Sequence, residues 1–346
     1  MRVVLPLVAL LLAGCSKQSA LGLSPSADAD YDVPSDGTDS AGDTASPDPD
    51  GEQAGTLTAG VWDDNDNYDV FGSFLSDNGQ LAGTPDFTDA ERDSAHARSE
   101  QDPGAKNTLD VALVLDTTGS MGDELAYLQA EFDALANQIG SSFPNAQQRW
   151  ALVLYRDHGD AYLTDVHDFT SDLAAFQATL NDASFDGGGD YPEAPDQALD
   201  EMAGLDWRSG NTARLAFWVA DAPHHVGDES RLADAVRSAV DQDVHIYPVA
   251  ASGVDVLAEY SMRSAAQLTL GRYLFLTDDS GVGGAHREPS IPCYFVTRFD
   301  HAVLRMVDVE MTGEYREPTE DEIIRTGGAP EDGACQLADG STVLSF

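Results

Sequence analysis

The chain has 346 residues, of which 61 are acidic and 18 are basic, so its formal net charge at pH 7 is −43. Proteins that bind nucleic acids neutralise phosphates with clustered Lys and Arg, so this charge excludes nucleic acids as expected partners. It favours a protein that stays soluble and attracts divalent cations. The length is sufficient for one or two domains with a sizeable core.

The first 15 residues have the pattern of an export signal. Arg2 is followed by an apolar run over residues 3–12, which is too short to span a bilayer but is typical of a signal peptide. The sequence LAGC, which ends at Cys15, resembles the lipobox of bacterial lipoproteins, in which the cysteine is lipidated and becomes the new N-terminus. That resemblance implies a signal peptide over 1–15 and a lipid on Cys15. Because Ser16 follows, it also implies the outer membrane of a bacterial cell envelope, with membrane contact through the lipid anchor only. A plain secretory signal with an incidental cysteine is the alternative.

Two segments of different composition follow. Residues 16–54 are rich in Ser, Asp, Pro, Gly, Ala and Thr, and cannot bury enough apolar surface to offset the entropy of ordering. We therefore expect a disordered acidic tether there. Residues 55–105 contain more aromatic side chains, and we expect a short packed lead-in segment. Asp64, Asp66 and Asp69 raise the alternative of a calcium loop, although the Gly and Glu that an EF-hand requires are missing.

Residues 106–312 alternate between buried strands and amphipathic helices. Apolar runs predict strands at 110–115, 151–155, 214–220, 244–250 and 272–276, with an antiparallel edge strand between 162 and 169. Helical periodicity occurs at 122–140, 171–181, 195–204, 229–240 and 254–267. This alternation predicts an α/β fold, with a doubly wound, mostly parallel sheet flanked by helices on both faces.

The first core strand ends abruptly at Asp116, and Thr118 and Ser120 follow at alternate positions. Alternate residues of an extended turn can direct their oxygens at one point, which gives one carboxylate and two hydroxyls. Mg²⁺ prefers such oxygen ligands and retains several waters, so few protein ligands suffice. The alternative is a simple helix N-cap, for which Asp, Ser and Thr are common.

The sequence DTTGSM at 116–121 resembles the first metal-site motif of the von Willebrand factor A domain family. The glycine-rich loop at 185–193 and the loop at 218–225 resemble the two later loops that complete the family's metal-ion-dependent adhesion site. In the first of these, Asp190 stands where better-known members carry a threonine. The resemblance implies a Mg²⁺ site, or one for Mn²⁺ or Ca²⁺. Its ligands would be Asp116, Thr118, Ser120, Asp190 and Asp221.

The resemblance implies a metal-dependent binding or adhesion module, whose partner is a protein or glycan that offers a carboxylate to the metal. No enzymatic activity is predicted. The motif at Asp116 also resembles the aspartyl-phosphate motif of haloacid-dehalogenase-like phosphatases, but these need a later lysine and the chain has none after Lys106. A Walker A loop and a G-x-S-x-G elbow are absent from the sequence as well. The alternatives are a structural envelope lipoprotein with a non-functional metal site and, with less support, a metal-dependent hydrolase.

Beyond Cys15 the sequence contains two further cysteines, Cys293 and Cys335. An even pair in an exported chain suggests a disulfide. It would attach the C-terminal tail, 313–346, to the last helix of the domain. Two separate buried thiols are the alternative.

Overall fold

The computed structural model describes residues 56–346, which all belong to one compact unit. The predicted signal peptide (1–15), the predicted lipidation site Cys15 and the predicted tether (16–54) lie outside the described residues. Within 56–346 no helix is both long and apolar enough to cross a membrane.

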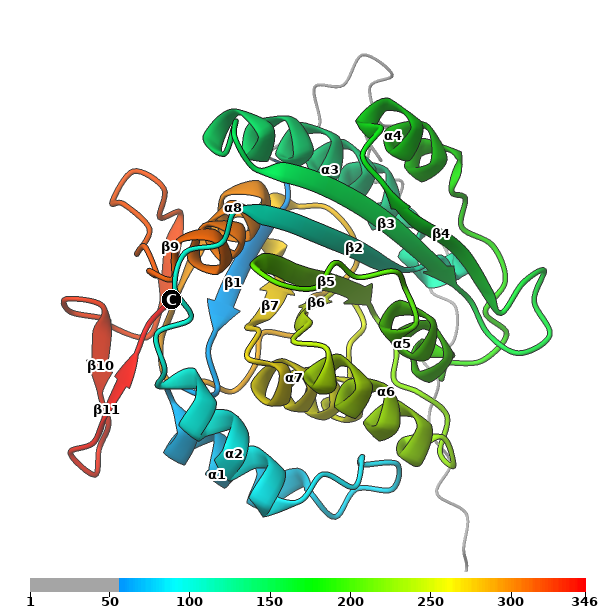
Figure 1. The fold of residues 1–346 in the computed structure, drawn as a ribbon. Coiled ribbons are helices and arrows are strands. Elements are labelled where there is room, and N and C mark those ends of the chain that lie inside the picture. The colour runs from blue at the N-terminus through cyan, green and yellow to red at the C-terminus, as the bar shows by residue number, and fades with distance from the viewer. Residues whose placement is uncertain (1–55) are drawn as a thin grey trace, which may run out of the picture. The chain divides into compact units, whose positions relative to one another are not determined.

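The unit is built on a nine-stranded mixed sheet in the order β4-β3-β2-β5-β6-β7-β1-β8-β9 (Figure 1). Its five central strands are parallel: β3 (Gln147–Tyr155), β2 (Thr108–Asp116), β5 (Thr212–Ala220), β6 (His245–Ala250) and β7 (Tyr273–Leu276). The edge strand β4 (Thr164–Thr170) is antiparallel to β3, as expected from the sequence. The strand β2 is buried along almost its whole length, which explains its continuous apolar run.

Helices cover both faces of this sheet, so the predicted α/β fold is confirmed (Figure 1). One face packs against α3 (Gly122–Ser142), α4 (Leu173–Asp182) and α8 (Phe299–Thr312), with Phe132, Leu180 and Met306 among the buried side chains. The other face packs against α5 (Pro195–Ala203), α6 (Glu229–Asp241) and α7 (Val256–Thr269). Local sequence sets several helix starts. For example, Asp172 and Asp255 cap α4 and α7 by accepting backbone hydrogen bonds from the third residue of each helix.

The lead-in segment is part of the same sheet. Its strand β1 (Thr58–Trp62) lies between β7 and β8 (Tyr294–Arg298) and is antiparallel to both. The helices α1 (Tyr68–Asn78) and α2 (Asp89–Ser99) follow it and pack near α7. Asp64 does not belong to an open calcium loop, because its carboxylate is buried against the guanidinium of Arg263 at 2.6 Å.

The C-terminal tail adds the edge strand of the sheet on the side opposite β4. The strand β9 (Arg325–Gly327) pairs with β8, and β10 (Ala334–Gln336) forms a separate hairpin with β11 (Thr342–Leu344). Cys293 and Cys335 form a disulfide. Cys293 precedes β8, so the bridge attaches the hairpin to the start of that strand and packs against Trp62 rather than against α8.

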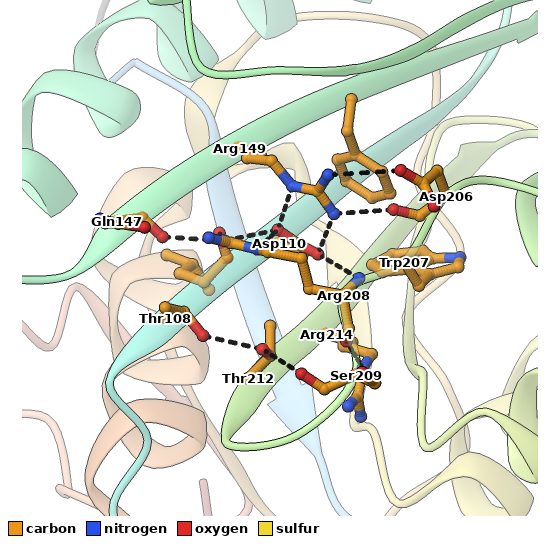
Figure 2. Close-up of polar contacts among 12 residues, drawn as sticks. Thr108, Asp110, Gln147, Arg149, Asp206, Trp207, Arg208, Ser209, Thr212 and Arg214 are labelled. Atoms are coloured by element: carbon orange, nitrogen blue, oxygen red, sulfur yellow. Dashed lines mark hydrogen bonds and ion pairs between the residues drawn. The ribbon is translucent and has the colours of Figure 1, made fainter.

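The starts of the central strands are held by ion pairs around Asp110 in β2 (Figure 2). Its fully buried carboxylate accepts two hydrogen bonds from the Arg149 guanidinium, at 3.0 and 2.7 Å. It accepts two more from Arg208, one from the side chain at 2.8 Å and one from the backbone N–H at 2.9 Å. These bonds fix the 205–211 loop against β2 and β3, at the opposite end of β2 from Asp116.

Candidate functional site

The candidate site begins where β2 turns into η1 (Gly119–Met121) and α3. Asp116, the last residue of β2, is almost fully buried, and its Oδ1 accepts hydrogen bonds from the Thr118 N–H at 2.9 Å and the Thr118 hydroxyl at 2.6 Å. The Thr118 and Ser120 hydroxyl oxygens lie 3.2 Å apart. Thr118 is buried and Ser120 is exposed. The three side chains predicted from the sequence therefore converge, and the last of them is open to solvent.

Asp221 comes to the same place because β5 pairs with β2 in parallel register, so both strands end at one rim of the sheet. Its carboxylate is buried and accepts a hydrogen bond from Ser120. Burial and the neighbouring Asp221 raise the pKa of Asp116 to about 7. Burial raises that of Asp221 to about 6, with Ser120 acting in the opposite direction and Glu124 adding to the rise. Oδ2 of Asp116 and Oδ1 of Asp221 are buried with no hydrogen-bond partner.

The glycine-rich loop packs directly onto this turn. The Gly119 N–H donates to the Gly187 carbonyl at 3.2 Å, and Gly188 has a positive φ of 69°. A Cβ atom at Gly188 would lie 2.9 Å from the Glu193 carboxylate and 3.1 Å from Cβ of Thr118. Because of both the backbone conformation and this close approach, glycine is required there.

The acidic side chain that this loop buries beside the site is Glu193. It is 2% exposed, whereas the predicted ligand Asp190 is exposed. Burial, followed by the charges of Asp116, Asp157 and Asp221, raises the pKa of Glu193 to about 9. Its Oε2 has no hydrogen-bond partner. Glu193 lies in the same predicted loop, but the resemblance points to Asp190, which occupies the position where better-known members of the family carry a threonine.

Histidines and further carboxylates surround the cluster. His225 Nε2 lies 2.6 Å from Asp157 Oδ1, and His224 Nε2 lies 2.8 Å from the Gly83 carbonyl. Burial lowers the pKa of His224. Both histidines therefore have hydrogen-bond partners outside the predicted ligand set. Asp160 accepts a hydrogen bond from the Gly188 N–H at 3.0 Å and so helps to hold the glycine loop.

Residues 56–346 contain no group of three or more His, Cys, Asp or Glu side chains arranged to hold a metal ion by themselves. The predicted site depends on a different donor set, in which the hydroxyls of Thr118 and Ser120 complement the carboxylates of Asp116, Asp190 and Asp221. The two partnerless carboxylate oxygens and the adjacent hydroxyls are all hard oxygen donors, which suit Mg²⁺, Mn²⁺ or Ca²⁺. The residues present therefore fit a hard divalent cation.

Residues 110–256, from β2 to the start of α7, match the family model of the von Willebrand factor A domain. This region is therefore similar to von Willebrand factor A domains. It contains Asp116, Thr118, Ser120, Asp190 and Asp221 and lacks the lead-in strand β1 and the tail.

Two further comparisons find proteins that are similar to parts of this chain. A protein of Acanthamoeba polyphaga mimivirus, described as an ariadne-like RING finger protein, is 32% identical over 123 residues. The match covers 36% of this chain and 12% of that protein, so the chain spans a small part of its relative's length. A crystal structure of the conserved hypothetical protein BatB from Bacteroides thetaiotaomicron aligns with a TM-score of 0.42 and 12% identity, over 58% of this chain and 98% of that one.

Proposed function

We propose that the von Willebrand factor A domain binds a divalent cation at Asp116, Thr118, Ser120 and Asp221 and uses it to hold a carboxylate of a protein or glycan partner. The observation that carries this proposal is the pair of buried, partnerless carboxylate oxygens on Asp116 and Asp221. An unpaired charge in this position is costly unless a cation compensates it.

The residues of the proposed site have different parts in this proposal. Hydrogen bonds from Thr118 fix the orientation of the Asp116 carboxylate, and Ser120 connects the motif to Asp221. Because Ser120 is exposed, a partner can approach from that side. The cation, when bound, supplies a positive centre at which an incoming carboxylate replaces water. Mg²⁺ is the first choice, with Mn²⁺ and Ca²⁺ as alternatives.

The glycine-rich loop offers two acidic side chains for the site, Asp190 and Glu193. Asp190 was selected from its place in the motif, whereas Glu193 has the buried carboxylate beside Asp116 and Thr118. We propose that Glu193 acts next to the cation and that Asp190 lies on the surface which the partner approaches. Neither residue is assigned a catalytic role, and we propose no enzymatic activity.

We place this module on a lipid-anchored bacterial envelope protein, held through Cys15 at the outer membrane. The acidic segment 16–54 would then separate the domain from the lipid surface. A structural envelope protein with a non-functional metal site is the second candidate. This candidate would be favoured if the full chain bound none of Mg²⁺, Mn²⁺ and Ca²⁺.

The test is calorimetric titration of the full chain with Mg²⁺, Mn²⁺ and Ca²⁺. We expect one-to-one binding that is lost in Asp116→Ala and strongly weakened in Glu193→Gln, while the exposed Asp190→Asn serves as the matched control and binds nearly as the wild type does. Circular dichroism confirms that each variant is folded. Unchanged Mg²⁺ affinity in folded Asp116→Ala would refute the site, and a loss in Asp190→Asn alone would restore Asp190 as the loop ligand.

A further inference from the structure

A cavity lies among α1, α2 and α7, away from the rim of the proposed metal site. It has a volume of about 530 Å³, which is within the range of small-molecule sites. Figure 1 shows α1 and α2 side by side next to α7, below the sheet. None of the proposed metal-site residues lines it; its lining includes Tyr68, Gly72, Phe87, Arg92 and Tyr260.

The lining residue that distinguishes this cavity is Arg92, whose side chain is 4% exposed. Nη1 of Arg92 is buried with no partner in hydrogen-bond geometry, and its Nη2 donates a 3.3 Å hydrogen bond to the Ser264 hydroxyl. Within residues 56–346 it forms no ion pair with a carboxylate at 4.0 Å or less. Burial lowers the pKa of Arg92, and the nearby Tyr260 hydroxyl acts in the opposite direction.

A neighbouring arginine provides a comparison inside the same molecule. Arg263 on α7 is also fully buried, but its guanidinium pairs with Asp64 at 2.6 Å and with Glu259 at 3.1 Å. Two carboxylates thus pair with the buried guanidinium of Arg263, and no carboxylate among residues 56–346 pairs with that of Arg92. Arg92 lines the cavity, and a ligand bound there could supply a carboxylate next to its guanidinium.

The other lining residues indicate the shape and polarity of such a ligand. Tyr68, Phe87 and Tyr260 are aromatic walls, and the Arg92 guanidinium lies 5.6 Å from the centre of the Phe87 ring. The carboxylates of Asp89 and Asp93 also line the cavity, and Asp93 accepts a hydrogen bond from the Tyr68 hydroxyl at 2.8 Å. Because these acids repel negative charge, they favour a single carboxylate over a phosphate dianion.

Helix α2 does not offer an anion site of its own. Thr88 and Glu91 form a capping box at its start, and the acidic side chains of Asp89 and Glu91 in its first turn repel an anion there. The charge that the cavity presents to an anion therefore comes from the Arg92 side chain. We propose that this cavity binds a small monocarboxylate with an apolar or aromatic body, the carboxylate on Arg92 and the body against Tyr68, Phe87 and Tyr260.

The proposal is tested by titrating the full chain with 3-phenylpropanoate and with its neutral amide, 3-phenylpropanamide. We expect saturable binding of the acid and binding of the amide weaker by about 10- to 100-fold, since a hydrogen bond to a charged group is lost. Arg92→Met should lower the affinity for the acid by a similar factor and leave that for the amide nearly unchanged. Equal affinities for acid and amide, or no saturable binding of the acid, would overturn the proposal.

Gly72→Leu provides a variant that leaves Arg92 in place. A Cβ atom at Gly72 would meet nothing within 4 Å, so the larger side chain can extend into the cavity. Leucine is also a better helix former than glycine, so the thermal midpoint should be equal or higher. We expect loss of 3-phenylpropanoate binding with Mg²⁺ affinity unchanged, which separates this site from the metal site. Wild-type affinity for 3-phenylpropanoate in folded Gly72→Leu would overturn the assignment to this cavity.

Discussion

Replacing Asp110 by asparagine is the sharpest test of how the sheet is held together (Figure 2). The carboxylate is fully buried and accepts four hydrogen bonds, two at each oxygen, from Arg149 and Arg208. These bonds keep the pKa of Asp110 below its ordinary value, despite the opposing effect of burial. Asparagine has nearly the same shape, but it places an NH₂ group where two of the donors point.

The expected cost follows from those contacts. The two bonds to Oδ2, from Arg149 at 2.7 Å and from the Arg208 N–H at 2.9 Å, are lost. A hydrogen bond to a charged group contributes about 1.5–3 kcal/mol, so their loss costs about 3–6 kcal/mol. Because the two arginine side chains are 19% and 23% exposed, water compensates part of this loss. We expect the free energy of unfolding to fall by about 3–4 kcal/mol, in line with measured costs of breaking buried ion pairs.

Equilibrium urea unfolding at pH 7 measures this loss. The matched control is Asp206→Asn, since Asp206 contacts Arg149 at 3.7 Å but is 85% exposed, and its change should be about 0–1 kcal/mol. A folded pKa below the unfolded one means that the Asp110 contribution is present above the unfolded value, 3.8, and is lost as the pH falls below it. The difference between wild type and Asp110→Asn should therefore shrink below that pH. A loss at pH 7 no larger than that of the control would refute the reasoning.

Three further predictions concern the rim, the disulfide and the lead-in strand. The folded pKa of Glu193, about 9, is above its unfolded value of 4.5, so the metal-free protein should lose stability as the pH rises from 4.5 through 9. Thermal melts in EDTA should show that the melting temperature falls less with rising pH in Glu193→Gln than in the wild type. An equal fall in both proteins would contradict this. Replacing both Cys293 and Cys335 by serine should lower the free energy of unfolding by about 4 kcal/mol in the chain-entropy treatment, measured by urea unfolding against the oxidised wild type. Gly60→Ala should cost about 1–3 kcal/mol, because its Cβ would lie 2.2 Å from the buried Phe275 ring; a wild-type melting temperature would argue against this packing.

The central fold could be predicted from the sequence because its strands are buried on both faces. A strand such as β2 shows a continuous apolar run that ends sharply at Asp116, and the helices between strands have clear periodicity. The strand β1 gave no such signal. Its five residues include Gly60 and are followed by a run of acidic and amide residues, and only pairing with β7 and β8, more than 200 positions away, makes it a strand. Contacts this distant leave no local pattern in the sequence.

The candidate site was predictable where it depends on strand ends and not where it depends on loop geometry. Asp116 and Asp221 follow buried parallel strands, so their convergence could be derived from register alone. Which acid of the glycine loop is buried depends on the positive φ values of Gly187 and Gly188, which turn the chain before Glu193. Glycine permits such conformations without specifying them, so spacing alone could not separate Asp190 from Glu193.

The two ends of β2 carry buried carboxylates in opposite electrostatic surroundings, which supports the proposal of a cation at the Asp116 end. Asp110 and Asp116 are both buried carboxylates of one strand, separated by about 20 Å. At the first end the fold brings two arginines to the charge, and the pKa of Asp110 is lowered. At the second end the neighbouring charges are Asp221 and other carboxylates, and the pKa of Asp116 is raised. Folding could remove this repulsion with basic side chains, as Arg149 and Arg208 do at Asp110. In the proposed function, a hard cation would stabilise this rim, which combines partnerless carboxylate oxygens with two hydroxyls. Stability that rises with added Mg²⁺ in the wild type, but not in Asp116→Ala, would express that difference.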